Sequence, residues 1–221
     1  MKNINLLGMK LQDRYVRESL MLTDRFIKKG TAHIILYLTT AVLLEAAKNE
    51  DEKEWIEAAD VTLWGDTEIL EAAEITAKGR YYEVKEKEFL NTFLRRMAKI
   101  HKSILVLSDT EEHAQELKAE LIEMQNGITI VGTMTIQDIV GSQEKVINEI
   151  NIIAPTVIMV RMPFPMQQKW LINSRKYMNA GIWIGMPEDF SCISKKEMPV
   201  EKVGKRILNV LFSRKVNKYK K

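Results

Sequence analysis

Short apolar runs, several of them rich in β-branched residues, alternate with segments of helical periodicity along most of the chain. Seven of these runs are expected to form strands, at residues 4–7, 33–38, 61–64, 104–107, 128–131, 157–160 and 181–185. Strands that alternate with helices imply a parallel sheet, because parallel strands need crossover connections. The alternation therefore predicts an α/β, Rossmann-like fold: a largely parallel sheet of about six or seven strands with helices on both faces.

Local signals predict how two of the connections are built. Asp13 is expected to cap a helix that Gly30 ends, so that the run at 4–7 and this helix form the first β-α unit. Residues 78–84 keep neither helical nor strand periodicity for long. This loss of periodicity predicts a surface loop.

The character of the chain changes after the last expected strand. We divide it into an α/β domain, residues 1–186, and a C-terminal basic appendage, residues 187–221, in which residues 203–212 are expected to form an amphipathic helix. Residues 202–221 contain eight Lys or Arg residues and no acid. The positive charge of the chain is therefore concentrated in one terminal segment.

Composition excludes several classes of protein. With 46% hydrophobic and 29% charged residues the chain is typical of a globular protein, and its net charge of +3 does not favour nucleic-acid binding. The longest apolar stretch, residues 34–47, is shorter than the roughly 20 residues that a membrane-spanning helix needs. The start of the chain is too short and too polar for a secretory signal, and Cys192 is the only cysteine. We therefore expect a cytoplasmic protein.

The segment that follows the run at 157–160 is a candidate ligand-binding loop. Pro163 and Pro165 are expected to end the strand, and Pro165 is suited to the first turn of the next helix, where no backbone donor is needed. Ligands of open α/β sheets bind at the carboxyl ends of the strands. Gln167 and Gln168 are expected to lie at that edge, with a solvated first helical turn as the alternative.

Signatures of other chemistries are missing from the sequence. It contains no glycine-rich dinucleotide or triphosphate loop, no G-x-S-x-G, no H-E-x-x-H and no paired C-x-x-C. The three histidines, His33, His101 and His113, are scattered and are interpreted as structural.

Several segments resemble, in order, the WecG/TagA/CpsF family of bacterial glycosyltransferases. They include I-N-L-L-G-M-K-L near the start, A-A-D-V-T-L-W-G-D at 58–66, V-G-T at 131–133 and P-M-Q-Q-K-W at 165–170, and the resemblance spans residues 4–186. The family has Pro-Asp-Gly where this chain has Trp64-Gly65-Asp66. It also has Gln-Glu in place of the pair of glutamines, and glycines where Arg161 and Pro163 stand.

The resemblance implies a metal-independent glycosyltransferase of cell-surface polysaccharide synthesis. It would move a hexose similar to N-acetylmannosamine from a UDP-sugar to a polyprenyl-diphosphate-linked saccharide, with no cofactor beyond the donor. Asp66 would be the catalytic base that takes the proton from the acceptor hydroxyl. The alternative role of Asp66 is to cap the helix that follows it. Thr39 and Thr40 likewise have the alternative role of capping the helix that follows them.

The strand-end rule and the resemblance together give the expected substrate-binding residues: Thr39, Thr40, Gly65, Arg161, Phe164, Gln167, Gln168, Arg206 and Arg214. The basic tail after Ser213 is expected to contact an anionic membrane surface or the substrate diphosphate, with a solvated or disordered tail as the alternative. Contact with the membrane would make the protein peripheral at its inner face. The sequence also leaves open whether the chain forms a homo-oligomer or binds a partner transferase. The alternative function is a catalytically degenerate homologue that binds a nucleotide-sugar or a partner protein.

Overall fold

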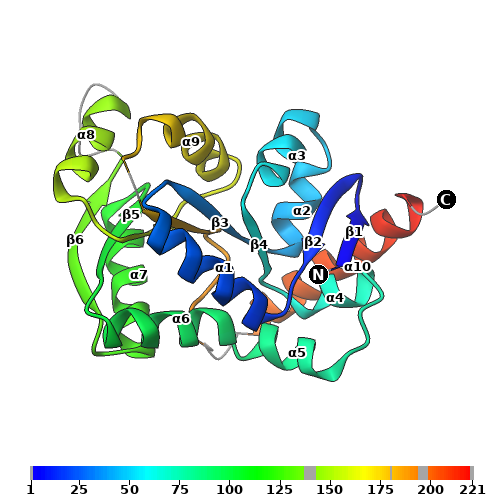
Figure 1. Cartoon of the computed structure of the whole chain (residues 1–221). Helices are drawn as coiled ribbons and strands as arrows, with labels where there is room; N and C mark the ends of the chain where they lie inside the picture. The colour runs from blue at the N-terminus through cyan, green and yellow to red at the C-terminus, as the bar shows by residue number, and fades with distance from the viewer. Residues whose placement is uncertain (1, 137–142, 180, 194–198, 220–221) are drawn as a thin grey trace.

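The computed structural model describes residues 2–136, 143–179, 181–193 and 199–219. Its centre is a six-stranded sheet with the order β4-β3-β8-β7-β5-β6, in which every paired strand is parallel (Figure 1). The strands are β3 (His33–Leu38), β4 (Val61–Trp64), β5 (Ser103–Ser108), β6 (Thr129–Thr135), β7 (Val157–Arg161) and β8 (Ile182–Met186). The α/β fold with a parallel sheet is confirmed.

Helices cover both faces of the sheet, because the inner strands are apolar on both sides. One face packs against α1 (Val16–Lys29), α6 (Glu88–Lys99) and α7 (Glu111–Met124). The other packs against α2 (Thr40–Ala46), α3 (Glu50–Glu57), α8 (Gln143–Ile153) and α9 (Met166–Ser174), which a short 3₁₀ turn (Arg175–Tyr177) extends. Two short helices, α4 (Thr67–Ala72) and α5 (Lys78–Lys85), connect β4 to α6.

The N-terminal segment does not form the expected first β-α unit. Instead, β1 (Lys2–Leu6) and β2 (Met9–Asp13) form a separate antiparallel hairpin, turned by Leu7 and Gly8 with φ angles of 53° and 85°. Such a tight turn matches the twist of two antiparallel strands. Asp13 ends β2 and does not cap α1, whose N-cap is Tyr15; Gly30 ends that helix in the left-handed conformation, as predicted.

The loop expected at 78–84 is wrong, because these residues form α5. Arg80 is 4% exposed and its guanidinium donates to Asp13 and to Glu83, while Asp13 also accepts from the Trp64 indole N–H at 2.7 Å. Buried ion pairs and hydrogen bonds therefore order a segment that has no amphipathic pattern.

The C-terminal helix α10 (Pro199–Tyr219) is longer than the expected 203–212 and packs against α2 and α4. Phe212 and Val216 are buried in the core that contains α2 and α3, and the Lys215 ammonium donates to the Leu44 carbonyl at 3.2 Å. In the part of the chain that the structure describes, no helix is both long and apolar enough to cross a bilayer.

Gly185 in β8 allows close packing at the centre of the sheet. A Cβ atom there would lie 2.6 Å from the Gln167 Oε1 and 2.7 Å from the Leu36 Cδ2. Both contacts are shorter than van der Waals distance, so the glycine is required by the side chains on either side of it.

We predict that Gly185→Ala destabilises the protein by about 1–3 kcal/mol, the usual effect of overpacking a core. Gly79→Ala is the matched control, because nothing lies within 4 Å of a Cβ atom at that helical position. The control should stabilise by up to about 1 kcal/mol. Urea unfolding measures both changes; equal effects of the two substitutions would contradict the packing argument.

Candidate functional site

The register of β3 and β4 brings two predicted segments together. Leu38 pairs with Trp64, so Thr39 and Thr40 lie beside Gly65 and Asp66 where the two strands end. The Gly65 N–H donates to the Leu38 carbonyl at 2.8 Å. A Cβ atom on Gly65 would lie 3.0 Å from the Thr39 Cγ2, so this close approach depends on glycine.

Asp66 holds the start of the neighbouring helix and does not cap its own. It occupies the N-cap position of α4 but makes no capping hydrogen bond, so the capping alternative is wrong. Its Oδ2 accepts from the Thr40 N–H at 2.7 Å and from the Thr40 hydroxyl at 3.0 Å. Within the described residues, Oδ1 accepts no hydrogen bond from another side chain or backbone group. Thr39 does act as a cap, accepting from the Val42 N–H at 3.3 Å.

The surroundings of Asp66 make its carboxylate more basic than usual. Burial is the largest influence and raises the pKa of Asp66, and the charge of Glu68 acts in the same direction. The hydrogen bonds from Thr40 and the positive charge of Lys205 on α10 oppose the shift but do not cancel it. A carboxylate with a raised pKa is suited to accept a proton near neutral pH.

Sequence reasoning missed a second acid at this site. Asp189 follows β8, and its Oδ1 accepts from the Thr39 hydroxyl at 3.2 Å. Asp189 as a whole residue is exposed, but its carboxyl group lies against the protein beside Thr39. Loss of water around this carboxyl group is the main cause that raises the pKa of Asp189, and the nearby charge of Asp66 contributes to the increase. An acid a few residues after an apolar strand was a usable signal, because the carboxyl ends of parallel strands share one edge.

The predicted glutamines are buried. Gln167 is 0% exposed and its amide donates to the carbonyls of Val160 at 3.2 Å and Met186 at 2.6 Å. Gln168 is 1% exposed and donates to Gln167 at 3.4 Å. The alternative of a solvated first turn is therefore wrong. Phe164 is half-buried against the core, and Pro165 precedes α9 as its N-cap residue.

Of the remaining predicted residues, Arg161 lies apart from Asp66. Arg161 ends β7, three strands away in the sheet order, which corresponds to about 14 Å across the sheet. It is buried and paired with Glu120 at 2.6 Å. Arg206 and Arg214 are exposed on α10. All three carboxyl strand ends, of β3, β4 and β7, lie on one edge of the sheet.

The same edge carries an Asp–His pair at the end of β5. The His113 ring nitrogen Nδ1 lies 2.8 Å from the Asp109 Oδ1, and this contact is the main reason that the pKa of His113 is raised. His113, interpreted above as structural, therefore contacts an aspartate that directly follows a strand.

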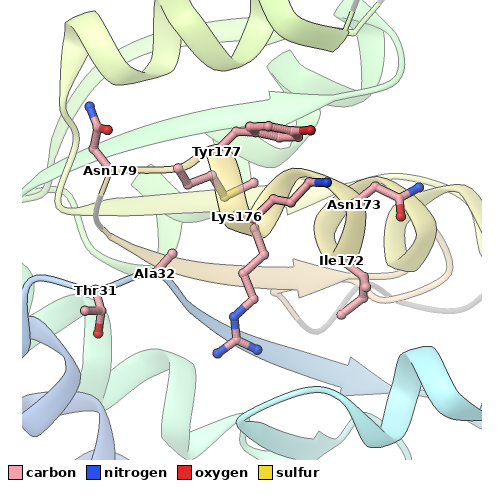
Figure 2. A pocket seen from close by; sticks show the side chains of 9 residues that line it. Thr31, Ala32, Ile172, Asn173, Lys176, Tyr177 and Asn179 are labelled. Atoms are coloured by element: carbon pink, nitrogen blue, oxygen red, sulfur yellow. The ribbon is translucent and has the colours of Figure 1, made fainter.

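An open hollow of about 800 Å³ lies at the opposite edge of the sheet (Figure 2). It is lined by Thr31, Ala32, Ile172, Asn173, Arg175, Lys176, Tyr177, Met178 and Asn179. Thr31 and Ala32 precede β3, so this hollow is separated from Asp66 by the length of the strand.

Among the described residues, no group of three or more His, Cys, Asp or Glu side chains is arranged to hold a metal ion. Metal independence stays a prediction.

We predict that Asp66→Asn does not lower stability at neutral pH. A carboxyl group whose pKa is raised by folding stabilises the folded state less as pH rises through that pKa, and asparagine avoids this loss. The variant should therefore match or exceed the parent in Tm at pH 7. The difference in its favour should shrink below the ordinary aspartate pKa of about 3.9. Thermal unfolding measured across this pH range tests the sign; a variant that is less stable only at neutral pH would contradict it.

Comparison with known protein families matches residues 4–199 to the glycosyl transferase WecG/TagA/CpsF family. A comparison with curated proteins finds no match. The match covers most of the 221 residues, includes both strand ends that meet at Asp66, and agrees with the parallel α/β fold. This chain therefore belongs to the WecG/TagA/CpsF family, a membership that implies a glycosyltransferase of cell-surface polysaccharide synthesis.

Proposed function

We propose that the protein transfers a hexose similar to N-acetylmannosamine from a UDP-sugar to a lipid-linked saccharide, without a metal ion. Family membership supports a nucleotide-sugar donor and a lipid-linked acceptor. The identity of the sugar and of the nucleotide rests on the resemblance described above.

The observation that carries this proposal is the position of Asp66 at the carboxyl edge of the sheet. Two hydrogen bonds from Thr40 orient the carboxylate through Oδ2. Its Oδ1 is then the atom that takes the proton from the acceptor hydroxyl. As that proton leaves, the acceptor oxygen bonds to the anomeric carbon, and the bond from this carbon to the diphosphate oxygen breaks.

The departing diphosphate needs positive charge beside it. Lys205 lies near enough for its charge to lower the pKa of Asp66, and its side chain is exposed on α10. Arg206 follows on the same helix. We assign diphosphate stabilisation to this end of α10, together with the substrate-binding roles predicted for Arg206 and Arg214.

The outer face of α10 supports contact with a membrane. Ile207, Val210 and Leu211 are 58%, 51% and 50% exposed, and their spacing places them on one stripe with Arg214. The opposite stripe is fixed to the protein through Phe212 and Val216. An exposed apolar stripe beside cations is suited to an anionic membrane surface, where the lipid-linked acceptor is held.

One observation favours the second candidate in its partner-binding form, a homologue without turnover. The amide of Gln167 is engaged with two backbone carbonyls, so it has no donor directed at a ligand in this conformation. Measured sugar transfer by the purified protein would exclude this candidate.

We predict that Asp66→Asn lowers kcat by about 100-fold or more while UDP binding is retained, because only proton transfer is lost. Release of UDP from a UDP-sugar in the presence of a lipid-linked acceptor measures kcat, and tryptophan fluorescence follows the UDP titration. Asp24→Asn, in an exposed ion pair with Arg96, is the control and should leave both unchanged. Full turnover by Asp66→Asn would remove Asp66 as the base.

We also predict that Val210→Ser/Leu211→Ser weakens sedimentation with anionic vesicles several-fold, because apolar contact is lost while the positive charges remain. Ile152→Ser is the matched control, since Ile152 is 84% exposed on α8, at the other end of the sheet (Figure 1). Equal binding by the two variants would argue against contact through α10.

A further inference from the structure

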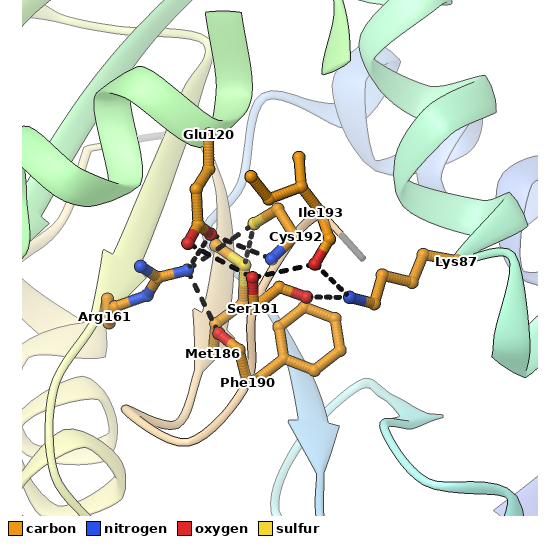
Figure 3. A network of polar contacts seen from close by, with 8 residues as sticks. All are labelled: Lys87, Glu120, Arg161, Met186, Phe190, Ser191, Cys192 and Ile193. Carbon is orange, nitrogen blue, oxygen red and sulfur yellow. Dashed lines mark hydrogen bonds and ion pairs between the residues drawn. The ribbon is translucent and has the colours of Figure 1, made fainter. Parts of the chain in front are cut away.

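The segment after β8 is fastened by side chains from three other elements (Figure 3). Residues 190–193 follow Asp189 directly and contact Arg161 from β7, Glu120 from α7 and Lys87 from the start of α6. We call Arg161, Glu120 and Lys87 the clasp.

Arg161 and Glu120 form the buried half of the clasp. The two side chains are 3% and 5% exposed and lie 2.6 Å apart. Arg161 also donates to the Phe190 carbonyl at 3.0 Å, and Glu120 accepts from the Cys192 N–H at 2.9 Å. The Ser191 hydroxyl donates to Glu120 at 3.2 Å. Each of the two charged groups therefore forms hydrogen bonds with the segment as well as an ion pair with the other.

Lys87 fastens the same segment from the other side. Its ammonium donates to the Ser191 carbonyl and, at 3.2 Å, to the Ile193 carbonyl. It also lies 5.2 Å from the ring of Phe190, which stacks on Tyr37 of β3 with ring centroids 4.4 Å apart. Phe190 thus lies between the Lys87 ammonium and β3, the strand that Thr39 follows.

Cys192, enclosed by this network, is not a reactive group. Burial raises the pKa of its thiol to about 12, so it stays protonated at neutral pH. The network therefore does not serve to activate this thiol. Its contacts instead fix the position of residues 190–193.

A buried ion pair is a poor source of stability, because the cost of removing two charges from water offsets their attraction. An apolar pair would fill the same space between α7 and β7. What an apolar pair cannot do is bond to the Phe190 carbonyl and the Cys192 N–H. The charges are explained if they fix the conformation of this segment.

We propose that the clasp is a positioning device that holds Asp189 against Thr39, and so completes the wall of the transferase site around Asp66. The inference rests on the proposed function for its catalytic consequence. Its geometric content, that Arg161 and Glu120 keep Asp189 beside Asp66, does not depend on turnover.

The test is the double substitution Arg161→Met/Glu120→Met, which replaces the ion pair with apolar side chains of similar length and leaves no buried charge unpaired. Arg96→Met/Asp24→Met removes an ion pair between α6 and α1 and is the control. Hydrogen exchange of the backbone N–H groups of residues 188–193 is the first readout. We expect it to become at least tenfold faster in the clasp variant, while exchange in β3 and β7 is unchanged in both proteins.

Titration of the Asp189 carboxyl group, followed by carbon NMR, is the second readout. Loss of surrounding water and the charges of Asp66 and Glu188 raise the pKa of Asp189, and the hydrogen bond from Thr39 opposes this increase. Displacement of Asp189 should move its titration to lower pH, since its enclosure and the nearby charge of Asp66 are lost. Unchanged exchange, or an unchanged titration, would overturn the proposal even if the protein transfers no sugar.

Turnover gives the functional half of the test. The clasp variant should lose on the order of tenfold to a hundredfold in kcat/KM, as expected for a misplaced wall of a site. Asp189→Asn added to the clasp variant should cost less than it does in the parent, because both changes act through one group. Additive losses, or full activity of the clasp variant, would refute positioning through Asp189.

Discussion

The site depends on the parallel register that pairs Leu38 with Trp64. This pairing makes two chain segments leave the sheet at the same level, and Gly65 lets them approach until Asp66 can reach the start of α2. A shift of one residue would turn every side chain of β4 to the opposite face of the sheet. The carboxylate, the two threonines and the loop that carries Asp189 would then no longer meet. The register of the strands in the core therefore also determines which side chains meet at the edge of the sheet.

The sheet was predictable because its inner strands are buried on both faces and read as continuous apolar runs. Residues 157–160, Val-Ile-Met-Val, are an example, since all four are buried. The errors arose where tertiary contacts decide local structure. The hairpin of β1 and β2 depends on two residues with positive φ, one of which is Leu7, and the helix α5 depends on the buried ion pairs of Arg80. Neither the positive φ angles nor the ion pairs appear in the sequence as a helical or strand periodicity.

The candidate site was predictable in part. Thr39, Thr40, Gly65 and Asp66 were found because residues at strand ends share an edge, and the structure brings them together. Asp189 and the clasp were missed because their partners lie far away in the sequence: Arg161 meets Glu120 across 41 positions, and Thr39 meets Asp189 across 150. Arg161 stands where the family resemblance leads one to expect glycine, so the clasp could not be transferred from the family either.

The hairpin of β1 and β2 also affects whether further strands can add to the edges of the sheet. It lies beside β4, with the Thr62 hydroxyl 3.5 Å from the Gln12 carbonyl, so one margin of the sheet is shielded from edge-to-edge pairing (Figure 1). The opposite margin is β6, whose ladder with β5 is interrupted between Ile104 and Leu105. Unbounded growth by strand addition needs two open, regular margins, and natural sheets avoid presenting them. Here one is shielded and the other is irregular, a geometry that disfavours fibre-like assembly.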